Sequence, residues 1–161
     1  MPEVVSDTSP LQYLYQTELL HLLPALYRRV IIAPAVAGEL SRGRALALCL
    51  PVVVAFPWIV LQDLRQGPAA MKELGAGEVE TLALGLEFPG SLLLLDDRLA
   101  RRRARSLGLR FTGTLGVVVK AKQVGLLAGV GPVLDRLLVL GFRASPATRA
   151  AALKLAEEPP A

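Results

Sequence analysis

Acidic residues at five positions are the side chains of this sequence best suited to chemistry: Asp7, Glu39, Glu78, Asp96 and Asp97. Carboxylates that gather within a few ångströms repel one another, so they either raise one another's pKa or bind a hard cation. Mg²⁺ and Mn²⁺ suit ligand sets made only of oxygen, and such an ion can activate water and polarise a phosphoryl oxygen. The acids therefore indicate metal-dependent hydrolysis of a phosphodiester, provided that the fold brings them together.

Each of these acids also has a purely structural interpretation. Asp7 is placed to cap the helix that follows it, and Asp96 and Asp97 are placed to cap and charge the start of another. Glu78 can favour a helix dipole in the same way, and Glu39 can lie on a solvated helix edge. Taken singly, the residues leave both interpretations open, so the elements that position them decide.

Short apolar runs alternate with helical patterns along the whole chain. The expected strands cover residues 4–6, 30–33, 92–95 and 110–111, with one interrupted strand or two short ones at 52–56 and 58–61. The expected helices cover residues 10–27 with a break at Pro24, a segment from Pro34 onwards, and 77–88, 97–107, 115–124, 132–140 and 146–157. This alternation predicts an α/β fold with three layers, α/β/α, around a central, mainly parallel sheet.

The carboxyl edge of such a sheet is where the acids should meet. In open parallel sheets, ligands bind beyond the carboxyl ends of the strands, near the point where the strand order reverses. Asp7 follows the first strand, and Asp96 and Asp97 follow the leucine-rich strand about ninety residues later. Glu78, in the first turn of its helix, and Glu39, in the second helical segment, complete the expected set.

An arginine-rich helix follows the last two acids. Arg98, Arg101, Arg102 and Arg105 share one helical face, at the spacing i, i+3, i+4 and i+7. A solvated basic surface and a phosphate-binding surface both fit this pattern. The net charge of +4 is modest, but six arginines fall within the 13 residues that end at Arg110, which favours a polyanion as partner.

Composition excludes several other classes of protein. With 161 residues, 53% of them hydrophobic and 20% charged, the chain suits one folded domain. One histidine, His21, and one cysteine, Cys49, argue against a histidine-clustered zinc site, a Ser-His or Cys-His nucleophile and an internal disulfide, and favour a cytoplasmic location. The uncharged run at 45–61 is short for a membrane span and contains Pro51 and Pro57, so no membrane segment is expected.

Four segments, in this order, make the chain resemble the PIN-domain family. They read VVSDTSPL, VIIAPAVAGEL, LGAGEVETLALGLE and LLLLDDRLARRRARSLGLRFTGTLGVVVKAKQVGLL, and the likeness runs from about Val4 to Phe142. The chain is most similar to the bacterial and archaeal subgroup described as predicted nucleic-acid-binding proteins, and more distantly to the toxin ribonucleases of toxin–antitoxin pairs. The resemblance implies a PIN-like domain over 1–145, with a C-terminal helix and tail at 146–161 packed on it or extending it.

The resemblance also implies an activity and a set of site residues. PIN domains gather acids around Mg²⁺ or Mn²⁺ to hydrolyse RNA, which makes this chain an expected endoribonuclease. Asp7 matches the first acid of the family and Glu39 the acid of the second helix. Glu78 matches the third, where relatives more often have Asp, and the fourth falls on Asp96 or Asp97. The toxins often carry a hydroxyl residue where this chain has Leu95.

Further expectations concern neighbours and partners. Thr8 or Ser9 should supply a hydroxyl beside the acids, and RNA should bind along the arginine-rich helix. An antitoxin protein is the expected inhibitor of a toxin-like member, and the apolar run at 52–61 favours a homodimer. Because Glu78 and Leu95 depart from the family pattern, the alternative is a PIN-like module that binds RNA or protein without cleaving it.

Overall fold

The computed structural model describes residues 2–69 and 71–160 of the chain. The expected start of the PIN-like domain at residue 1 and the expected end of the C-terminal tail at residue 161 lie outside the described residues. Within the described residues the strands are β1 (Val4–Ser6), β2 (Val30–Ile32), β3 (Ile59–Leu61), β4 (Leu92–Leu94) and β5 (Arg110–Thr112). The helices are α1 (Thr8–Gln16), α2 (Leu22–Tyr27), α3 (Pro34–Ala45), the 3₁₀-helix η1 (Val53–Ala55), α4 (Ala76–Glu87), α5 (Arg98–Ser106), α6 (Thr114–Gln123), α7 (Gly131–Val139) and α8 (Pro146–Leu155).

The strands form one parallel sheet in the order β3-β2-β1-β4-β5. The central strand is β1, whose Val5 pairs with Ile31 on one side and with Leu93 on the other. The chain builds the sheet outward from β1 through β2 to β3, then crosses back to add β4 and β5 on the opposite side. The strand order therefore reverses between β1 and β4, which is where a binding crevice is expected in such a sheet.

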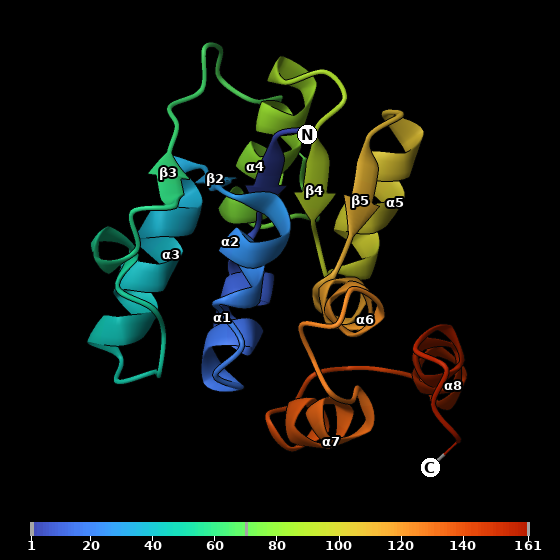
Figure 1. The fold of residues 1–161 in the computed structure, drawn as a ribbon. Coiled ribbons are helices and arrows are strands. Elements are labelled where there is room, and N and C mark those ends of the chain that lie inside the picture. Colours follow the sequence, from blue (N-terminus) through green and yellow to red (C-terminus); the bar gives the residue numbers. More distant parts are fainter. Residues whose placement is uncertain (1, 70, 161) are drawn as a thin grey trace.

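Helices cover both faces of the sheet, so the predicted three-layer α/β/α fold is confirmed. Helices α1 and α2 pack with α6, whereas α4 packs with α5 and against β1 and β4 (Figure 1). Helix α3 contacts both α1 and α4. None of the helices in the described part of the chain is long and apolar enough to cross a membrane.

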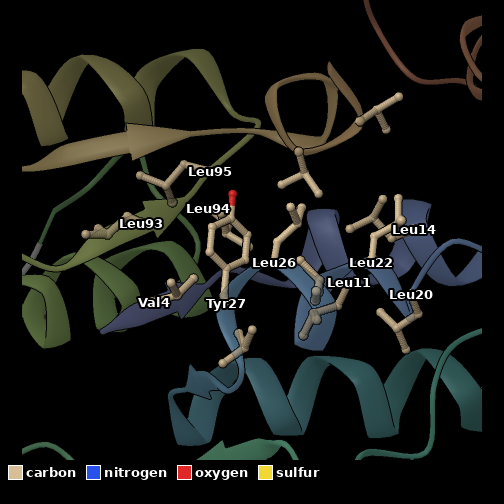
Figure 2. Packing of buried hydrophobic residues seen from close by; sticks show 14 of the residues in the cluster. Val4, Leu11, Leu14, Leu20, Leu22, Leu26, Tyr27, Leu93, Leu94 and Leu95 are labelled. Atoms are coloured by element: carbon tan, nitrogen blue, oxygen red, sulfur yellow. The ribbon is translucent and has the colours of Figure 1, made fainter. Parts of the chain in front are cut away.

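The core lies between the sheet and the helices, and its composition follows from the apolar runs of the sequence. Val4 of β1 and the leucines that follow Leu92 are shielded from solvent: Leu93, Leu94 and Leu95 are fully buried (Figure 2). On the helical side, Leu11 and Leu14 of α1 meet Leu22 and Leu26 of α2 in the same cluster (Figure 2). Strands buried on both faces are typical of parallel sheets, which explains the continuous apolar run of β4.

The C-terminal helices α7 and α8 are joined to each other by polar contacts, and α8 packs on the rest of the domain. Helix α8 packs on α6, and Arg149 of α8 pairs with Asp135 of α7. Glu158, just beyond α8, accepts hydrogen bonds from the backbone N–H groups of Val130 (2.6 Å) and Gly131 (3.2 Å) at the start of α7. A carboxylate at a helix N-terminus satisfies donors that the helix itself leaves free.

Two sequence expectations about elements are wrong. Residues 52–56 form no strand; Pro51 and Pro57 bracket them, and 3₁₀-type bonds from Ala55 to Val52 and from Phe56 to Val53 turn the backbone. The expected helix at 10–27 breaks at residues 17–21, where Glu18 adopts a φ of 60°, and not at Pro24. Pro24 lies in the first turn of α2, where a proline removes no hydrogen bond from the helix.

Candidate functional site

The acids after β1 and β4 lie where the strand order reverses. Asp7 is the residue after β1, and its backbone N–H donates a hydrogen bond of 3.0 Å to the carbonyl of Leu94 in β4. Asp96 and Asp97 follow β4 after one further buried residue, Leu95. The structure thus places Asp7 on the same edge of the sheet as Asp96 and Asp97, which lie about ninety residues later in the sequence, as the motif order predicts.

Asp7 is the most buried member of the set. Its relative exposure is 4%. Asp7 is the N-cap residue of α1, as one interpretation of the sequence has it, but its side chain forms no capping hydrogen bond, so its carboxylate is not used as a cap. Among the described residues, its Oδ1 atom has no hydrogen-bond partner. A buried carboxylate oxygen without a partner is costly, and a bound cation is one of the few things that compensates for it.

Glu39 is held by two segments that are distant in sequence. The Thr8 hydroxyl donates to its Oε2, and the backbone N–H of Gly77 donates to its Oε1 at 2.9 Å. A Cβ atom at Gly77 would lie 2.5 Å from Oε2, so the close approach of the carboxylate to α4 requires glycine there. Glu39 is half-buried and anchored, which rules out the solvated helix edge.

Glu78 lies at the start of α4 and is partly committed to that helix. Its Oε2 accepts a hydrogen bond of 2.9 Å from the backbone N–H of Gly75, the N-cap residue. Glu80, two residues later, accepts a bond of 2.7 Å from the backbone N–H of Ala35 in the first turn of α3. Glu78 therefore bonds to the N-terminus of its own helix, α4, whereas Glu80 bonds to the N-terminus of α3 and so connects α4 to α3.

Asp96 and Asp97 are adjacent, but their environments differ. Asp96 is half-buried: Oδ2 accepts from the hydroxyls of Ser9 and Thr114, and Oδ1 from the backbone N–H of Thr114, each at 2.7 Å. Asp97 is exposed and is the N-cap of α5, because its Oδ2 accepts a bond of 2.9 Å from the backbone N–H of Ala100. The capping interpretation thus holds for Asp97 and not for Asp96, which faces the segment that follows β1.

The electrostatics of the site follow from burial and crowding. The pKa of Asp7 rises from 3.8 to about 7, mainly through burial; the charges of Glu78, Glu39 and Asp96 add to the rise, and a backbone N–H opposes it. Burial also raises the pKa of Glu78, again against a backbone hydrogen bond, and the charges of Asp97 and Glu39 add to the rise. Burial is thus the main cause of both shifts, and neighbouring carboxylates add to them.

The donor set fits a hard divalent cation. Within residues 2–69 and 71–160 no three acidic, histidine or cysteine side chains stand close enough to form a ready-made cluster, because hydrogen bonds hold Glu39, Glu78, Asp96 and Asp97 individually. All available ligands are carboxylate oxygens, the type that Mg²⁺ and Mn²⁺ prefer. The partnerless oxygen of Asp7 supplies the observation that favours a cation here.

An arginine-lined groove borders the acids. It has a volume of about 1040 Å³, and its lining includes Asp96 and Asp97 as well as the four arginines expected to bind substrate: Arg98, Arg101, Arg102 and Arg105. Arg101 and Arg105 place their guanidinium carbons 5.2 and 5.4 Å from the centre of the Phe111 ring. The arginine face of α5 therefore faces the site instead of lying on a remote surface.

Sequence reasoning missed several residues that position the acids. Thr114 is fully buried and holds both oxygens of Asp96, and Gly77 admits Glu39. A local signal existed for Thr114: it opens a helix directly after a strand, as Thr8 does after β1 and Asp7. No pattern in the sequence pointed to Phe111, whose role depends on the packing of α5 on β5.

Comparisons with known proteins identify the fold and the family. No curated protein matches the chain. Among solved structures, it is similar to a PilT N-terminus domain protein from the archaeon Sulfolobus solfataricus, with 15% identity, a TM-score of 0.57, and 75% of this chain and 93% of that chain covered. A family model described as a PIN domain (DUF3368) matches residues 3–158. The PIN domain is generally a metal-dependent nuclease fold, and this chain belongs to the PIN-domain family.

Proposed function

We propose that this PIN-domain protein is a divalent-metal-dependent endoribonuclease in which Asp7, Glu39, Glu78 and Asp96 hold Mg²⁺ or Mn²⁺. The observation that carries the proposal is the buried Oδ1 of Asp7, which lacks a partner among the described residues; burial, with smaller contributions from three other carboxylates, raises the pKa of Asp7. Acids crowded in this way, at the strand-order reversal of a parallel sheet, suit a cation-binding site better than a structural one.

The chemistry divides between the ion and the chain. When bound, a divalent cation supplies positive charge that polarises a phosphoryl oxygen and lowers the pKa of water. The hydroxyls of Thr8, Ser9 and Thr114 keep the carboxylates of Glu39 and Asp96 oriented toward the site. We assign Asp97 mainly to capping α5, which presents the arginines that hold the phosphates of the strand.

Cleavage assays test the proposal directly. The purified protein is incubated with labelled structured and unstructured RNAs in Mg²⁺, Mn²⁺ or EDTA, beside Asp7→Asn. The expected result is metal-dependent cleavage that Asp7→Asn abolishes while the variant remains folded. The matched control is Asp63→Asn, which neutralises an exposed carboxylate far from the acids in sequence and should cleave normally. Full activity of Asp7→Asn would contradict the proposal.

The second candidate is a PIN-like module that binds RNA or protein without cleaving it. One observation favours it: within the described residues, protein donors already engage Glu39, Glu78, Asp96 and Asp97, and no ready cluster of three ligands exists. RNA binding that survives EDTA, together with no turnover at any Mn²⁺ concentration, would establish this candidate. Metal-dependent cleavage would exclude it.

The toxin-like role remains a finer proposal based on the resemblance of the sequence. It includes an antitoxin protein as inhibitor, a cytoplasmic location and a homodimer. The exposed apolar side chains of Leu46, Val52 and Val54 support the dimer, although residues 52–56 form a 3₁₀-helix instead of the expected strand. Light scattering at micromolar concentration tests it, and a monomeric mass would refute it.

A further inference from the structure

The C-terminal part of the chain supplies a second set of residues that line the arginine-lined groove, the second wall. Besides residues of α5, the groove is lined by Phe142 to Ser145, which connect α7 to α8, and by Thr148 in the first turn of α8. The lining also includes Gly113, Leu115 and Gly116 at the start of α6. The second wall contributes a fifth arginine, Arg143, which neither the motif order nor the helical face of α5 indicates.

The second wall is fixed to the body of the domain near the acids. The ring of Phe142 packs edge-on against Tyr13 of α1, with ring centres 5.1 Å apart. Helix α1 also carries Thr8 and Ser9, whose hydroxyls hold Glu39 and Asp96. Arg143 itself is exposed and lies on the segment between α7 and α8, directly after a residue that is anchored on α1.

The positive charge of the groove is not neutralised inside the protein. Among residues 2–69 and 71–160, the salt bridges involve Arg29, Arg136 and Arg149, and none involves an arginine of the groove. Arg101 and Arg105 instead form cation–π contacts with the ring of Phe111. A ring face orders guanidinium groups without cancelling their charge, so the two side chains stay available to an anion.

Apolar side chains also line the groove: Phe111, Leu115, Leu138 and Phe142. A lining that combines guanidinium groups with apolar and aromatic side chains suits a strand with charged phosphates and flat, unpaired bases, which is how single-stranded nucleic acid is bound. The volume of about 1040 Å³ exceeds the roughly 300–1,000 Å³ that enclose one drug-sized ligand, so at least one nucleotide fits.

We propose that Arg143 and the segment from Phe142 to Thr148 form the second wall of a single-strand nucleic-acid groove, opposite the arginines of α5. Arg143 binds a phosphate across the groove, and Phe111 and Phe142 offer apolar faces to the bases. The inference rests on the proposed function in one respect: the strand that binds in the groove is the strand that the acids cleave. Binding itself requires no metal and no cleavage.

Binding in EDTA isolates this inference from catalysis. The probe is a fluorescein-labelled single-stranded RNA of 12 nucleotides, and the readout is anisotropy of the full chain across a salt series. Arg143→Ala should weaken binding about five-fold and reduce the slope of log K against log salt by about 0.7, the value for one phosphate contact on a single strand. Phe111→Leu, which keeps apolar volume but removes the ring face, should weaken binding about three-fold.

A matched control loses the same charge elsewhere. Arg44→Ala removes an exposed arginine of α3 and should leave both affinity and salt slope as in the wild-type protein. Equal behaviour of Arg143→Ala and Arg44→Ala, or equal binding of a duplex of the same sequence, would overturn the inference. Loss of binding in Arg143→Ala without any metal-dependent cleavage by wild type would support the groove and refute the nuclease. Cleavage by wild type with Arg143→Ala equal to its control would refute only the groove.

Discussion

Replacing Asp7 by asparagine should stabilise the metal-free protein while abolishing cleavage. The carboxylate is 4% exposed, its Oδ1 has no partner in the described part of the chain, and its pKa rises from 3.8 to about 7. An acid whose pKa is higher in the folded state than in the unfolded state binds more protons when folded, so stability falls as pH rises between the two values. The ionised carboxylate of Asp7 thus destabilises the fold at neutral pH, and the uncharged amide of the variant removes that effect.

The size of this destabilisation follows from the pKa. The interval from 3.8 to about 7, at about 1.4 kcal/mol per pKa unit, corresponds to an upper limit of roughly 4 kcal/mol at pH 8. About a third of this is present at pH 5, and almost none below pH 3.8. Because the buried amide of asparagine also lacks partners, we expect a net gain of about 2 kcal/mol at pH 8, which raises Tm by about 4–8 °C in a domain of this size.

Thermal unfolding in EDTA at pH 5 and pH 8 provides the measurement. Asp7→Asn should exceed wild type clearly at pH 8 and by much less at pH 5, whereas the exposed control Asp63→Asn should match wild type at both. Adding Mn²⁺ should raise the Tm of wild type and not of Asp7→Asn, since a ligand stabilises the state that binds it. A Tm difference at pH 8 that is zero, or the same as at pH 5, would refute the reasoning.

Three further variants probe the groups that hold the acids. Gly77→Ala places a Cβ 2.5 Å from Oε2 of Glu39 and should reduce cleavage at least about tenfold, with Tm within about 3 °C of wild type because alanine favours the helix. Thr114→Val removes one hydroxyl bond to Asp96 and should reduce cleavage about tenfold, measured as kcat/KM. Asp97→Asn should keep both the cap and the activity, whereas Asp97→Ala should lose about 1 kcal/mol of stability by denaturant unfolding.

Controls separate these effects from general damage. Gly67→Ala adds a methyl group where nothing lies within 4 Å and should leave cleavage unchanged. Ser106→Ala removes an exposed hydroxyl that donates to the carbonyl of Arg103 and does not line the groove, and it should leave kcat/KM close to that of wild type if Thr114 acts by orienting the acid. Loss of cleavage in Asp97→Asn, with its cap retained, would show that Asp97 does more than begin α5.

Much of the fold could be predicted because its central strands, β1, β2 and β4, are largely buried. The continuous apolar run of β4 and the β-branched run of β2 have no other stable use than the centre of a parallel sheet. The segment at 52–56 has equally strong β propensity, yet it forms a 3₁₀-helix, because tertiary position and two flanking prolines outweigh propensity. The break of the first helix depends on Thr17 and Glu18, for which hydrophobic periodicity gives no signal.

The positions of the acids could be predicted, but not what each one does locally. Their order along the chain predicted Asp7, Glu39, Glu78 and Asp96 on one edge of the sheet, and hydrogen bonds connect the segment after β1 to Glu39 through Thr8 and to Asp96 through Ser9. The distinction between Asp96 and its neighbour needed coordinates, since the start of α5 shifts by a single residue between the two interpretations. Contacts such as that of Thr114 with Asp96 connect separate elements, so no local pattern encodes them.

The long-range hydrogen bonds of Asp96 also determine when the site can exist during synthesis. Its carboxylate is held from one side by Ser9, near the beginning of the chain, and from the other by Thr114, after β5. A nascent chain in which Thr114 has not yet emerged from the ribosome lacks one of these two hydrogen-bond partners. Contacts between residues so far apart in the sequence also form late in folding. The acidic edge is therefore completed only after the whole sheet has emerged.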